Sequence, residues 1–389
     1  MEKVKVAIIG IGNMGTVHAE NIFDGNVDGL ELACICDIKQ SRLEWAKGRF
    51  GDAVHLFESS DELFKNADLF DAVIIAPPHY THPILAVTAF EHGKHVLVEK
   101  PAGVFVKNVR VMNEAAEKSG KKFCIMYNQR TNKLYQKARE LIQSSELGDL
   151  KRMIWIVTNW YRSQSYHDSS TWRSTWVGEG GGVLINQCPH NIDLWQWMCG
   201  MPKKVRASVG FGKYYNIEVE DDVTAYAEYE NGMTATFITS TGESPGTNRL
   251  EISGTKGKIV VEDNALTFYK NEVDEREFNA TYKGGFGNPA VEEIKIPIET
   301  NPHEQEHVKI MQNFANSILK DEPLLSPGIE GINGLTISNA IHLSAWTDNW
   351  VELPMNDDLF YDMLQDKIKN STFEKVENDG EVLNVSGSH

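Results

Sequence analysis

The sequence is poor in basic charge, in cysteine and in long apolar runs, and each shortage excludes a class of protein. Its 38 Lys and Arg residues face 55 Asp and Glu residues, which gives a formal net charge of −17. Such a chain has no basic excess to meet nucleic acid or an anionic membrane, so we expect neither as a partner. No apolar run approaches the roughly 18 residues of a membrane span, and the N-terminus enters a strand without a signal-peptide segment.

Cysteine usage indicates a reducing compartment. The five cysteines are odd in number, scattered and without a C-x-x-C pair, which favours a reduced, cytoplasmic protein. With 389 residues the chain is too long for one ordinary core, and its 41% hydrophobic and 24% charged residues are typical of a globular protein. We therefore expect two domains.

The first part of the chain alternates regularly between apolar strands and helices. Apolar runs cover 4–10, 31–37, 71–76, 94–100 and 121–128, and helical segments begin near Asn13, Gln40, Ser59, Thr81 and Lys107. Short continuous apolar strands separated by amphipathic helices indicate a parallel sheet that helices cover on both faces. Residues 1–128 are therefore predicted to form a doubly wound α/β domain.

The pattern changes after residue 128. Alternating strand-like runs follow at 151–161, 204–212, 222–230, 233–241, 249–254, 257–263 and 266–270, with helices near 188–199, 303–320 and 328–348. Turn signals such as "ENG" and "GTKG" separate several of these strands, as in antiparallel sheets. We expect an α+β domain with a large open, mostly antiparallel sheet over 129–355, and a peripheral helix and tail over 356–389.

A glycine-rich turn, "GIGNMG" at 10–15, follows the first strand and begins the first helix. In this context Gly10 permits a tight turn, Gly12 lets the backbone approach a pyrophosphate, and Gly15 allows close helix–strand packing. Asn13 and Met14 complete the turn, and the free N–H groups of the helix N-terminus favour an anion. The motif predicts a dinucleotide site.

An acidic residue, Asp37, ends the second strand 22 positions after Gly15. A carboxylate there can accept hydrogen bonds from the adenosine ribose, and it repels the 2′-phosphate of NADP. Ile38 is expected beside it. Lys39 and Arg42 lie nearby and keep NADP open as an alternative, but the carboxylate favours NAD.

A lysine, Lys100, ends the strand "HVLVEK" (95–100) and precedes Pro101. The carboxyl ends of strands in open α/β sheets face the ligand crevice, so Lys100 is predicted to be a positioned cation beside the nicotinamide. An ordinary solvated lysine at a strand end is the alternative.

Together these motifs, with "APPHYTH" (76–82), "EKPAG" (99–103) and "GGGVLINQCPHNIDLWQW" (180–197), resemble the glucose–fructose oxidoreductase, inositol dehydrogenase and rhizopine-catabolism (Gfo/Idh/MocA) family. The resemblance covers nearly the whole chain. It implies a Rossmann domain, a second α/β domain whose sheet often supports oligomers, and nicotinamide-dependent chemistry on sugars or cyclitols. It also implies that Lys100 hydrogen-bonds the reacting hydroxyl and that the cofactor cleft is lined by Pro77, His79, His82, Glu99 and Asn128.

The last motif contains the candidate base, His190. Many members of the family have an Asp four residues before this His, but this sequence has Asn186 there. Oxidation of an alcohol needs a base for the O–H proton, and imidazole suits that role near neutral pH. Pro189 favours a first helical turn, so the helix end and Lys100 should both hold His190 neutral.

Two interpretations of Asn186 remain open. It is the N-cap of the helix that follows, a common role for Asn. Alternatively the helix begins earlier, and the i,i+4 spacing places Asn186 and His190 on one inward face, where the amide orients a substrate hydroxyl.

Aromatic and basic residues between the strand at 151–161 and the glycine loop are candidates for the substrate site. They are Trp160, Arg162, Trp172, Arg173 and Trp176, with domain packing or an oligomer interface as the alternative. The loop "EGGG" (179–182) either closes over substrate or only permits a tight turn. The acidic "VEDD" (219–222) is expected to be solvated or to cap a strand.

No metal is expected. "HEQEH" (303–307) fits the zinc-protease pattern H-E-x-x-H, but "NP" just before it is typical of a helix start, and an apolar stripe from Val308 to Leu319 indicates a core-facing helix.

These observations predict a cytoplasmic NAD-dependent dehydrogenase that oxidises a secondary hydroxyl of a sugar, glycoside or cyclitol, with C3 of a glucoside as one candidate. The resemblance adds the expectation of a homo-oligomer, dimer or tetramer. A redox-neutral glycosidase that retains NAD and a non-catalytic NAD- or sugar-binding regulator are the alternatives. The presence of both Lys100 and His190 favours an enzyme.

Overall fold

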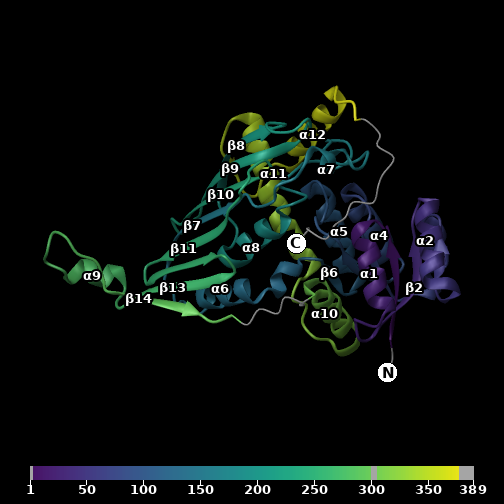
Figure 1. The fold of residues 1–389 in the computed structure, drawn as a ribbon, viewed down its shortest axis with the longest axis horizontal. Helices are drawn as coiled ribbons and strands as arrows, with labels where there is room; N and C mark the ends of the chain where they lie inside the picture. Colours follow the sequence, from purple (N-terminus) through teal and green to yellow (C-terminus); the bar gives the residue numbers. More distant parts are fainter. Residues whose placement is uncertain (1–2, 299–304, 376–389) are drawn as a thin grey trace.

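The computed structural model describes residues 3–298 and 305–375. Two sheets, with helices between them, make up most of the molecule (Figure 1). No helix among these residues is long and apolar enough to cross a membrane.

The first sheet has six parallel strands in the order β3-β2-β1-β4-β5-β6, the arrangement of a dinucleotide-binding domain. Its strands are β1 (Val4–Ile9), β2 (Leu30–Cys36), β3 (His55–Phe57), β4 (Ala72–Ile75), β5 (His95–Val98) and β6 (Phe123–Ile125). Its helices are α1 (Asn13–Phe23), α2 (Gln40–Phe50), α3 (Ser60–Lys65), α4 (His82–Glu91) and α5 (Val106–Ser119), with short 3₁₀ turns at η1 (Gly51–Ala53), η2 (Ala67–Leu69), η3 (His79–Thr81) and η4 (Asn128–Thr131). The predicted doubly wound domain is confirmed.

The second sheet has nine strands in the order β14-β13-β12-β11-β7-β10-β9-β8-β15. They are β7 (Leu150–Val157), β8 (Lys204–Phe211), β9 (Glu220–Glu228), β10 (Thr234–Ser240), β11 (Asn248–Gly254), β12 (Gly257–Glu262), β13 (Ala265–Asn271), β14 (Val291–Ile296) and β15 (Val351–Glu352). Neighbouring strands are antiparallel except β7 and β10, which pair in parallel. The prediction of a large open, mostly antiparallel sheet is therefore also confirmed.

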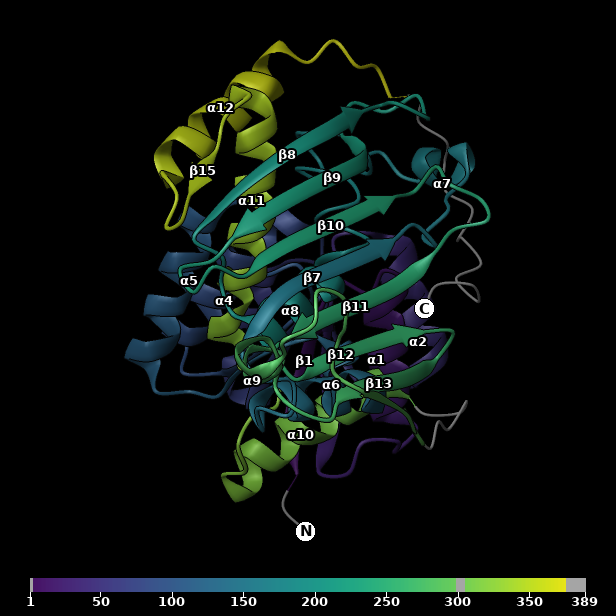
Figure 2. The same cartoon turned by 90° about the vertical axis from the view of Figure 1, so that its left-hand side faces the viewer.

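Helices cover one face of this sheet, and the other face is open to the viewer in Figure 2. The helices of this half are α6 (Lys133–Gln143), α7 (Gln164–Asp168), α8 (Pro189–Cys199), α9 (Glu275–Thr281), α10 (Glu306–Lys320), α11 (Gly331–Thr347) and α12 (Asp357–Asn370), with the turn η5 (Gly328–Glu330). The segment with α9 projects from the body as an arm (Figure 1). Between the two sheets lie α8 and α11, so α8 carries its residues to the junction of the two halves.

One helix returns to the first half of the molecule. The apolar side of α10, including Ile310, Met311 and Phe314, is buried in the same cluster as Val6 and Ile8 of β1. The Rossmann core therefore includes residues from beyond position 128, and the helix predicted near 303–320 begins at Glu306 in the described residues.

Several elements were not predicted. Helix α6 buries Leu134, Tyr135, Ala138 and Leu141 on one face, and the side chain of Asn132 caps it, so its helical period is present in the sequence. The strands β3 and β14 are harder to find. β3 has three residues, and β14 is an edge strand with a largely exposed, charged sequence.

Candidate active site

The glycine turn after β1 has the shape of a pyrophosphate cradle. Gly10 has φ +83°, and a Cβ there would lie 2.6 Å from the Pro77 nitrogen. A Cβ on Gly15 would lie 1.9 Å from the Gly10 oxygen, whereas one on Gly12 would meet nothing within 4 Å. Helix α1 has no side-chain cap at Gly12. Open space therefore lies over uncapped N–H groups, as the phosphates of NAD require.

The carboxylate of Asp37 lies against this turn. It accepts the N–H of Ile11 at 2.9 Å and that of Lys39 at 2.8 Å, which fixes it beside the cradle at the end of β2. Ile38 is 86% exposed, a suitable surface for an adenine ring. Arg42 is half-buried on α2, five positions after Asp37. The residues present fit the adenosine half of NAD.

Two charged residues follow β5, the buried Glu99 and the half-buried Lys100. Glu99 accepts a hydrogen bond from His18 at 2.7 Å, and its backbone neighbour Lys100 donates its N–H to the same carboxylate at 3.0 Å. Burial alone would raise the pKa of Glu99, but His18, His307 and Lys100 outweigh it and lower the pKa to about 2. Glu99 is therefore a fixed anion beneath Lys100.

The ammonium group of Lys100 points to the second half of the molecule. Its Nζ donates to the backbone carbonyl of Asn186 at 2.9 Å. Burial lowers the pKa of Lys100, and Arg173 and Arg162 act in the same direction against the charges of Glu99 and Glu179. Lys100 is thus a desolvated, oriented donor and not a solvated strand-end lysine, and the peptide bond to Pro101 is cis.

The other residues expected in the cofactor cleft have mixed roles. Both ring nitrogens of His82 lie 2.7 Å from carbonyl oxygens, those of Pro101 and Pro77, so this side chain joins two loops and has no nitrogen left for a ligand. Asn128 donates to Glu306 at 2.9 Å, and its buried Oδ1 has no hydrogen-bond partner among the described residues.

His190 lies in the first turn of α8, as the sequence predicts. It is 8% exposed, and its Nδ1 has no hydrogen-bond partner among the described residues. Burial first, then the charges of Lys100 and His307, hold the pKa of His190 well below its usual range. The ring is therefore neutral and able to accept a proton.

Both interpretations of Asn186 begin from a helix boundary that is wrong. Helix α8 begins at Pro189 with Cys188 as its N-cap, so Asn186 neither caps the helix nor lies one helical turn before His190. Instead its side-chain Nδ2 donates to the carboxylate of Glu179. Asn186 is half-buried, although its neighbours are buried.

Four of the five predicted substrate residues form a continuous set of ring and cation contacts. The guanidinium of Arg162 lies over Trp160 and Tyr166, that of Arg173 over Tyr166 and Trp172, and Trp172 lies edge-on to His79. Both arginines act electrostatically on Lys100. The buried Nε of Arg173 and indole N–H of Trp160 have no hydrogen-bond partner among the described residues, so unpaired donors remain for a polyhydroxylated ligand.

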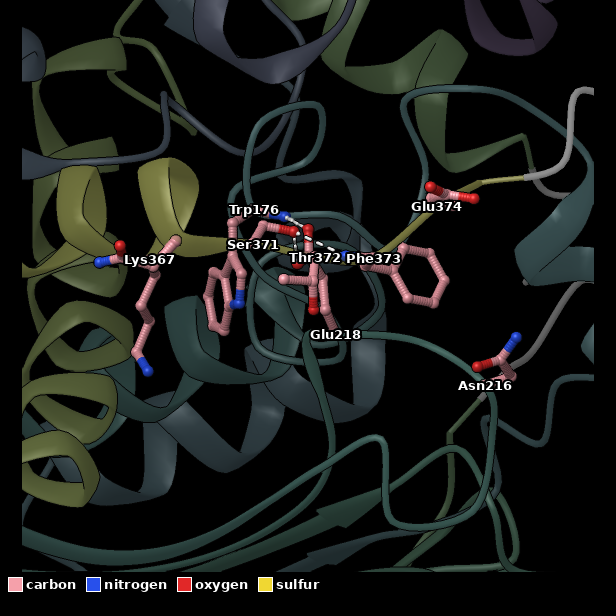
Figure 3. A pocket seen from close by; sticks show the side chains of 9 residues that line it. Trp176, Asn216, Glu218, Lys367, Ser371, Thr372, Phe373 and Glu374 are labelled. Carbon is pink, nitrogen blue, oxygen red and sulfur yellow. Dashed lines mark hydrogen bonds between the residues drawn. The ribbon is translucent and has the colours of Figure 1, made fainter.

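Trp176 does not join this set. Its ring packs against Phe211, His342 and Trp346, and it lines a cavity of about 640 Å³ with Glu218, Lys367 and residues 370–374 (Figure 3). Neither Lys100 nor His190 borders that cavity. The expectation that Trp176 contacts substrate is therefore corrected, because its aromatic surface is used in packing.

The glycine loop is a tight turn and not an open lid. A Cβ on Gly180 would lie 2.2 Å from Val104, and one on Gly182 would lie 2.1 Å from the Glu220 oxygen. The carboxylate of Glu220 accepts the N–H groups of Gly182 and Leu184 at 2.8 and 3.0 Å. Since Glu220 and Asp221 are buried, the expectation that "VEDD" is solvated is wrong.

No group of three or more metal-ligating side chains occurs in the described ranges 3–298 and 305–375. His303 and Glu304 of the zinc-protease pattern lie outside these ranges. His307 lies at the start of α10, with its ring 5.9 Å from that of His18. The sequence gives no role to His18, Tyr166, Glu179 or His307, although Glu179 begins the "EGGG" loop and His307 ends "HEQEH".

Comparison with known proteins identifies relatives of both halves. Residues 4–127 match the NAD-binding Rossmann fold of the GFO_IDH_MocA oxidoreductase family, and residues 135–260 match a GFO/IDH/MocA C-terminal domain. The NAD(+)-dependent scyllo-inositol 2-dehydrogenase of Bacillus subtilis is 25% identical over 67% of this chain and 74% of its own. Levoglucosan dehydrogenase of Pseudarthrobacter phenanthrenivorans is 23% identical over 91% and 99%.

Solved structures agree with these matches. The WlbA dehydrogenase of Chromobacterium violaceum, crystallised with NADH and UDP-GlcNAcA, superposes with a TM-score of 0.77 at 26% identity and covers 92% of this chain and 97% of that one. A levoglucosan dehydrogenase in complex with NADH and levoglucosan gives a TM-score of 0.73 at 19% identity, with 91% and 100% covered.

Proposed function

The chain belongs to the Gfo/Idh/MocA family of NAD-dependent oxidoreductases, and we propose that its substrate is a sugar, glycoside or cyclitol, oxidised at a secondary hydroxyl. The observation that supports this most directly is the position of Lys100. Lys100 follows a Rossmann strand at its carboxyl end, and its half-buried ammonium hydrogen-bonds the backbone of Asn186 in the segment that leads to His190. A donor and a neutral base thus meet at the ligand edge of the sheet.

Lys100 and His190 have different roles toward the substrate hydroxyl. Lys100 donates a hydrogen bond to the hydroxyl oxygen and stabilises negative charge that develops on it. His190 accepts the O–H proton on its neutral imidazole. Bound NAD would supply the acceptor for the hydride that leaves the carbon. Because His190 is buried and Lys100 is half-buried, both are partly shielded from water, and their electrostatic effect on the oxygen is stronger than at the surface.

In this proposal the glycine turn with Asn13 and Met14 holds the pyrophosphate of NAD. Asp37 with Ile38 and Arg42 holds the adenosine half. The rest of the cofactor cleft is lined by Pro77, His79, Glu99 and Asn128. The sugar rests on Trp160, Arg162, Trp172 and Arg173. Aromatic faces suit the C–H surfaces of a sugar ring, and guanidinium groups donate to its hydroxyls. The levoglucosan and inositol activities of relatives support this substrate class.

The domain division, the assembly and the cellular compartment are part of the same proposal. Residues 1–128 bind NAD, with α10 completing the core of that domain. The rest of 129–355 forms the substrate and assembly domain, and α12 packs on it through the buried Phe360 and Leu364. The uncovered face of the nine-stranded sheet supports a homo-oligomer of two or four chains. All five cysteines are free, which supports a reduced, cytoplasmic location.

The test is a substrate panel. Purified protein is mixed with NAD or NADP and a series of aldoses, glycosides and inositols, and NADH formation is followed by absorbance. We expect NADH with at least one neutral polyol and a preference for NAD over NADP. Release of free sugar from a chromogenic glycoside without net NADH would identify the redox-neutral glycosidase instead, and no reaction with any member would overturn the proposal.

A further inference from the structure

Glu179 is a buried acid in the candidate active site that the expected mechanism does not use. It is 1% exposed and begins the glycine loop. One carboxylate oxygen accepts the N–H of Ser174 at 2.5 Å, and the other accepts the side-chain amide of Asn186. Arg173 approaches to 4.0 Å. A buried carboxylate is costly unless it is paired in this way, so its position at this point calls for a role.

The contact fixes the orientation of the Asn186 amide. Both side-chain oxygens of Glu179 accept hydrogen bonds, one from the Ser174 N–H and one from Nδ2 of Asn186, so the NH₂ end of the amide faces Glu179. The Oδ1 end then faces away from it, and no described residue hydrogen-bonds to that oxygen. Asn186 is also half-buried, whereas every other residue of 179–196 is buried. Its backbone carbonyl holds Lys100 at 2.9 Å.

We propose that Glu179 is a positioning residue that holds the Asn186 amide with Oδ1 turned to the substrate cleft beside Lys100, where it accepts a hydrogen bond from a substrate hydroxyl. The pair of Glu179 and Asn186 thereby replaces the Asp that many family members carry at this position. The negative charge then lies on Glu179, behind Asn186, and the group that accepts the substrate's hydrogen bond is the neutral Oδ1 of Asn186. The inference rests on the proposed oxidation at Lys100 and His190.

The surroundings of Glu179 explain why an amide stands at position 186. The cations that act on it are Arg173, Lys100 and Lys375, and the anion is Glu220. Burial raises the pKa of Glu179, against the effects of Arg173, Ser174 and Asn186. An Asp at position 186 would bring a second carboxyl into contact with it, and two carboxyls at that distance share a proton. One carboxylate at either position is compatible with the site, but two are not.

Glu179 also connects the residues proposed to hold NAD with those proposed to hold the substrate. Its backbone oxygen lies 3.3 Å from Nδ1 of His79, which belongs to the loop after β4. The glycines that follow are packed against Val104 and Glu220, so the loop cannot move Glu179 without moving its neighbours. A rigid support of this kind is what a positioning residue requires.

A charge-swap cycle tests the proposal. In Glu179→Gln the carboxyl group that accepts the Asn186 amide is replaced by a second amide, so the Asn186 side chain can flip its NH₂ and oxygen ends. We expect kcat to fall about 10-fold to 100-fold, the effect of one lost charged hydrogen bond. Asn186→Asp places two carboxyls in contact and should lower kcat similarly, with an altered pH profile. The double variant has one carboxylate, now at 186, with an amide donor at 179. We expect it to recover kcat to within about 10-fold of wild type.

A residue that serves stability alone would not give this rescue. In that case the two losses multiply in the double variant, and this result would overturn the role of Glu179. Glu218→Gln is the matched control, because Glu218 hydrogen-bonds Trp176 and Ser371 outside the cleft. Combined with Asn186→Asp, it should give no recovery.

The cycle is also measured by thermal unfolding, which needs no substrate. We expect Asn186→Asp to lower Tm and Glu179→Gln to reverse that loss, since contact between two carboxyls is relieved. If the wild-type protein oxidises nothing in the panel, the proposed function fails. If the wild type is active and the kinetic cycle is additive, only the role of Glu179 fails.

Discussion

Nζ of Lys100 lies 2.9 Å from the backbone oxygen of Asn186, and this hydrogen bond joins the Rossmann sheet to the loop that leads into α8. The partner is a main-chain carbonyl, so the position of the ammonium does not depend on which side chain residue 186 carries. A substrate hydroxyl that enters the cleft meets a donor that is already oriented and desolvated, an arrangement that favours charge stabilisation.

Replacement of Lys100 by Met should therefore abolish most of the turnover without loss of cofactor binding. Met keeps the length of the side chain but has no donor. We expect kcat to fall by about 10²-fold to 10³-fold, as for the loss of one preorganised donor to a developing oxyanion. NADH affinity, measured by fluorescence titration, should stay within a few-fold of wild type. Turnover close to wild type would show that Lys100 does not contact the reacting oxygen.

The base is expected to work at unusually low pH. His190 must be neutral to accept a proton, and burial with Lys100 and His307 lowers its pKa well below the usual value. Its neutral form therefore persists as pH falls through about 6.5, the pKa of an ordinary histidine. We expect kcat/KM to remain level across that range and to decline only at lower pH.

His190→Ala is the companion variant. Its turnover should fall by about 10²-fold or more, with NADH affinity retained. The residual activity should rise with pH, because hydroxide or water then has to take the proton. A wild-type profile that loses half its kcat/KM near pH 6.5 would contradict the lowered pKa.

Much of this site can be predicted from sequence, since its parts follow elements with clear periods. The glycine turn, Asp37, Lys100 and His190 each stand at a strand or helix end that the apolar pattern locates. The first sheet was predictable for the same reason, because its central strands β1, β4 and β5 are almost wholly buried.

The remainder depends on contacts between distant segments. Glu179 meets Asn186 because the glycine loop turns tightly against Val104, and Glu220 is buried because β9 begins under that loop. No local pattern distinguishes these acids from solvated ones. The packing of α10 on β1 is likewise a long-range contact. The apolar stripe of the helix predicts that it packs on a core, but not which strand it contacts.

Cofactor preference should depend on Asp37. Its carboxylate accepts the N–H groups of Ile11 and Lys39, and we propose that it also binds the adenosine ribose. In Asp37→Asn the charge is lost but an acceptor remains. We expect NADH to bind about 10-fold more weakly or worse, the effect of a lost charged hydrogen bond, and NADPH to gain relative affinity. Calorimetric titration with both cofactors measures this.

Asp52→Asn is the control for that experiment. Asp52 is 95% exposed in the side chain and pairs with Lys47 at the surface after α2. The same chemical change there should leave the ratio of the two affinities unchanged. If Asp37→Asn also leaves the ratio unchanged, the carboxylate does not contact the ribose.

The stability of the site should depend on a buried ion pair behind His190. Arg130, in η4 just after β6, makes two parallel hydrogen bonds to Asp193 of α8, at 2.6 and 2.7 Å. The side chains are 0% and 1% exposed. Removal of one partner from such a pair leaves an uncompensated buried charge and costs about 3–5 kcal/mol. In Asp193→Asn, Arg130 still has its ion pair with Glu330 at 2.6 Å. We therefore expect the free energy of unfolding to fall by an amount near the lower end of this range, about 3 kcal/mol.

Urea denaturation followed by tryptophan fluorescence measures this loss. Asp358→Asn is the control, because Asp358 pairs with Lys107 at a similar 2.7 Å but with both side chains more than half exposed. That variant should lose much less stability than Asp193→Asn, because solvent screens an exposed pair. Since α8 also carries His190, Asp193→Asn should lower kcat more than it raises the KM for NAD. Equal losses of stability in the two variants would show that the buried pair does not fix α8 against the Rossmann domain.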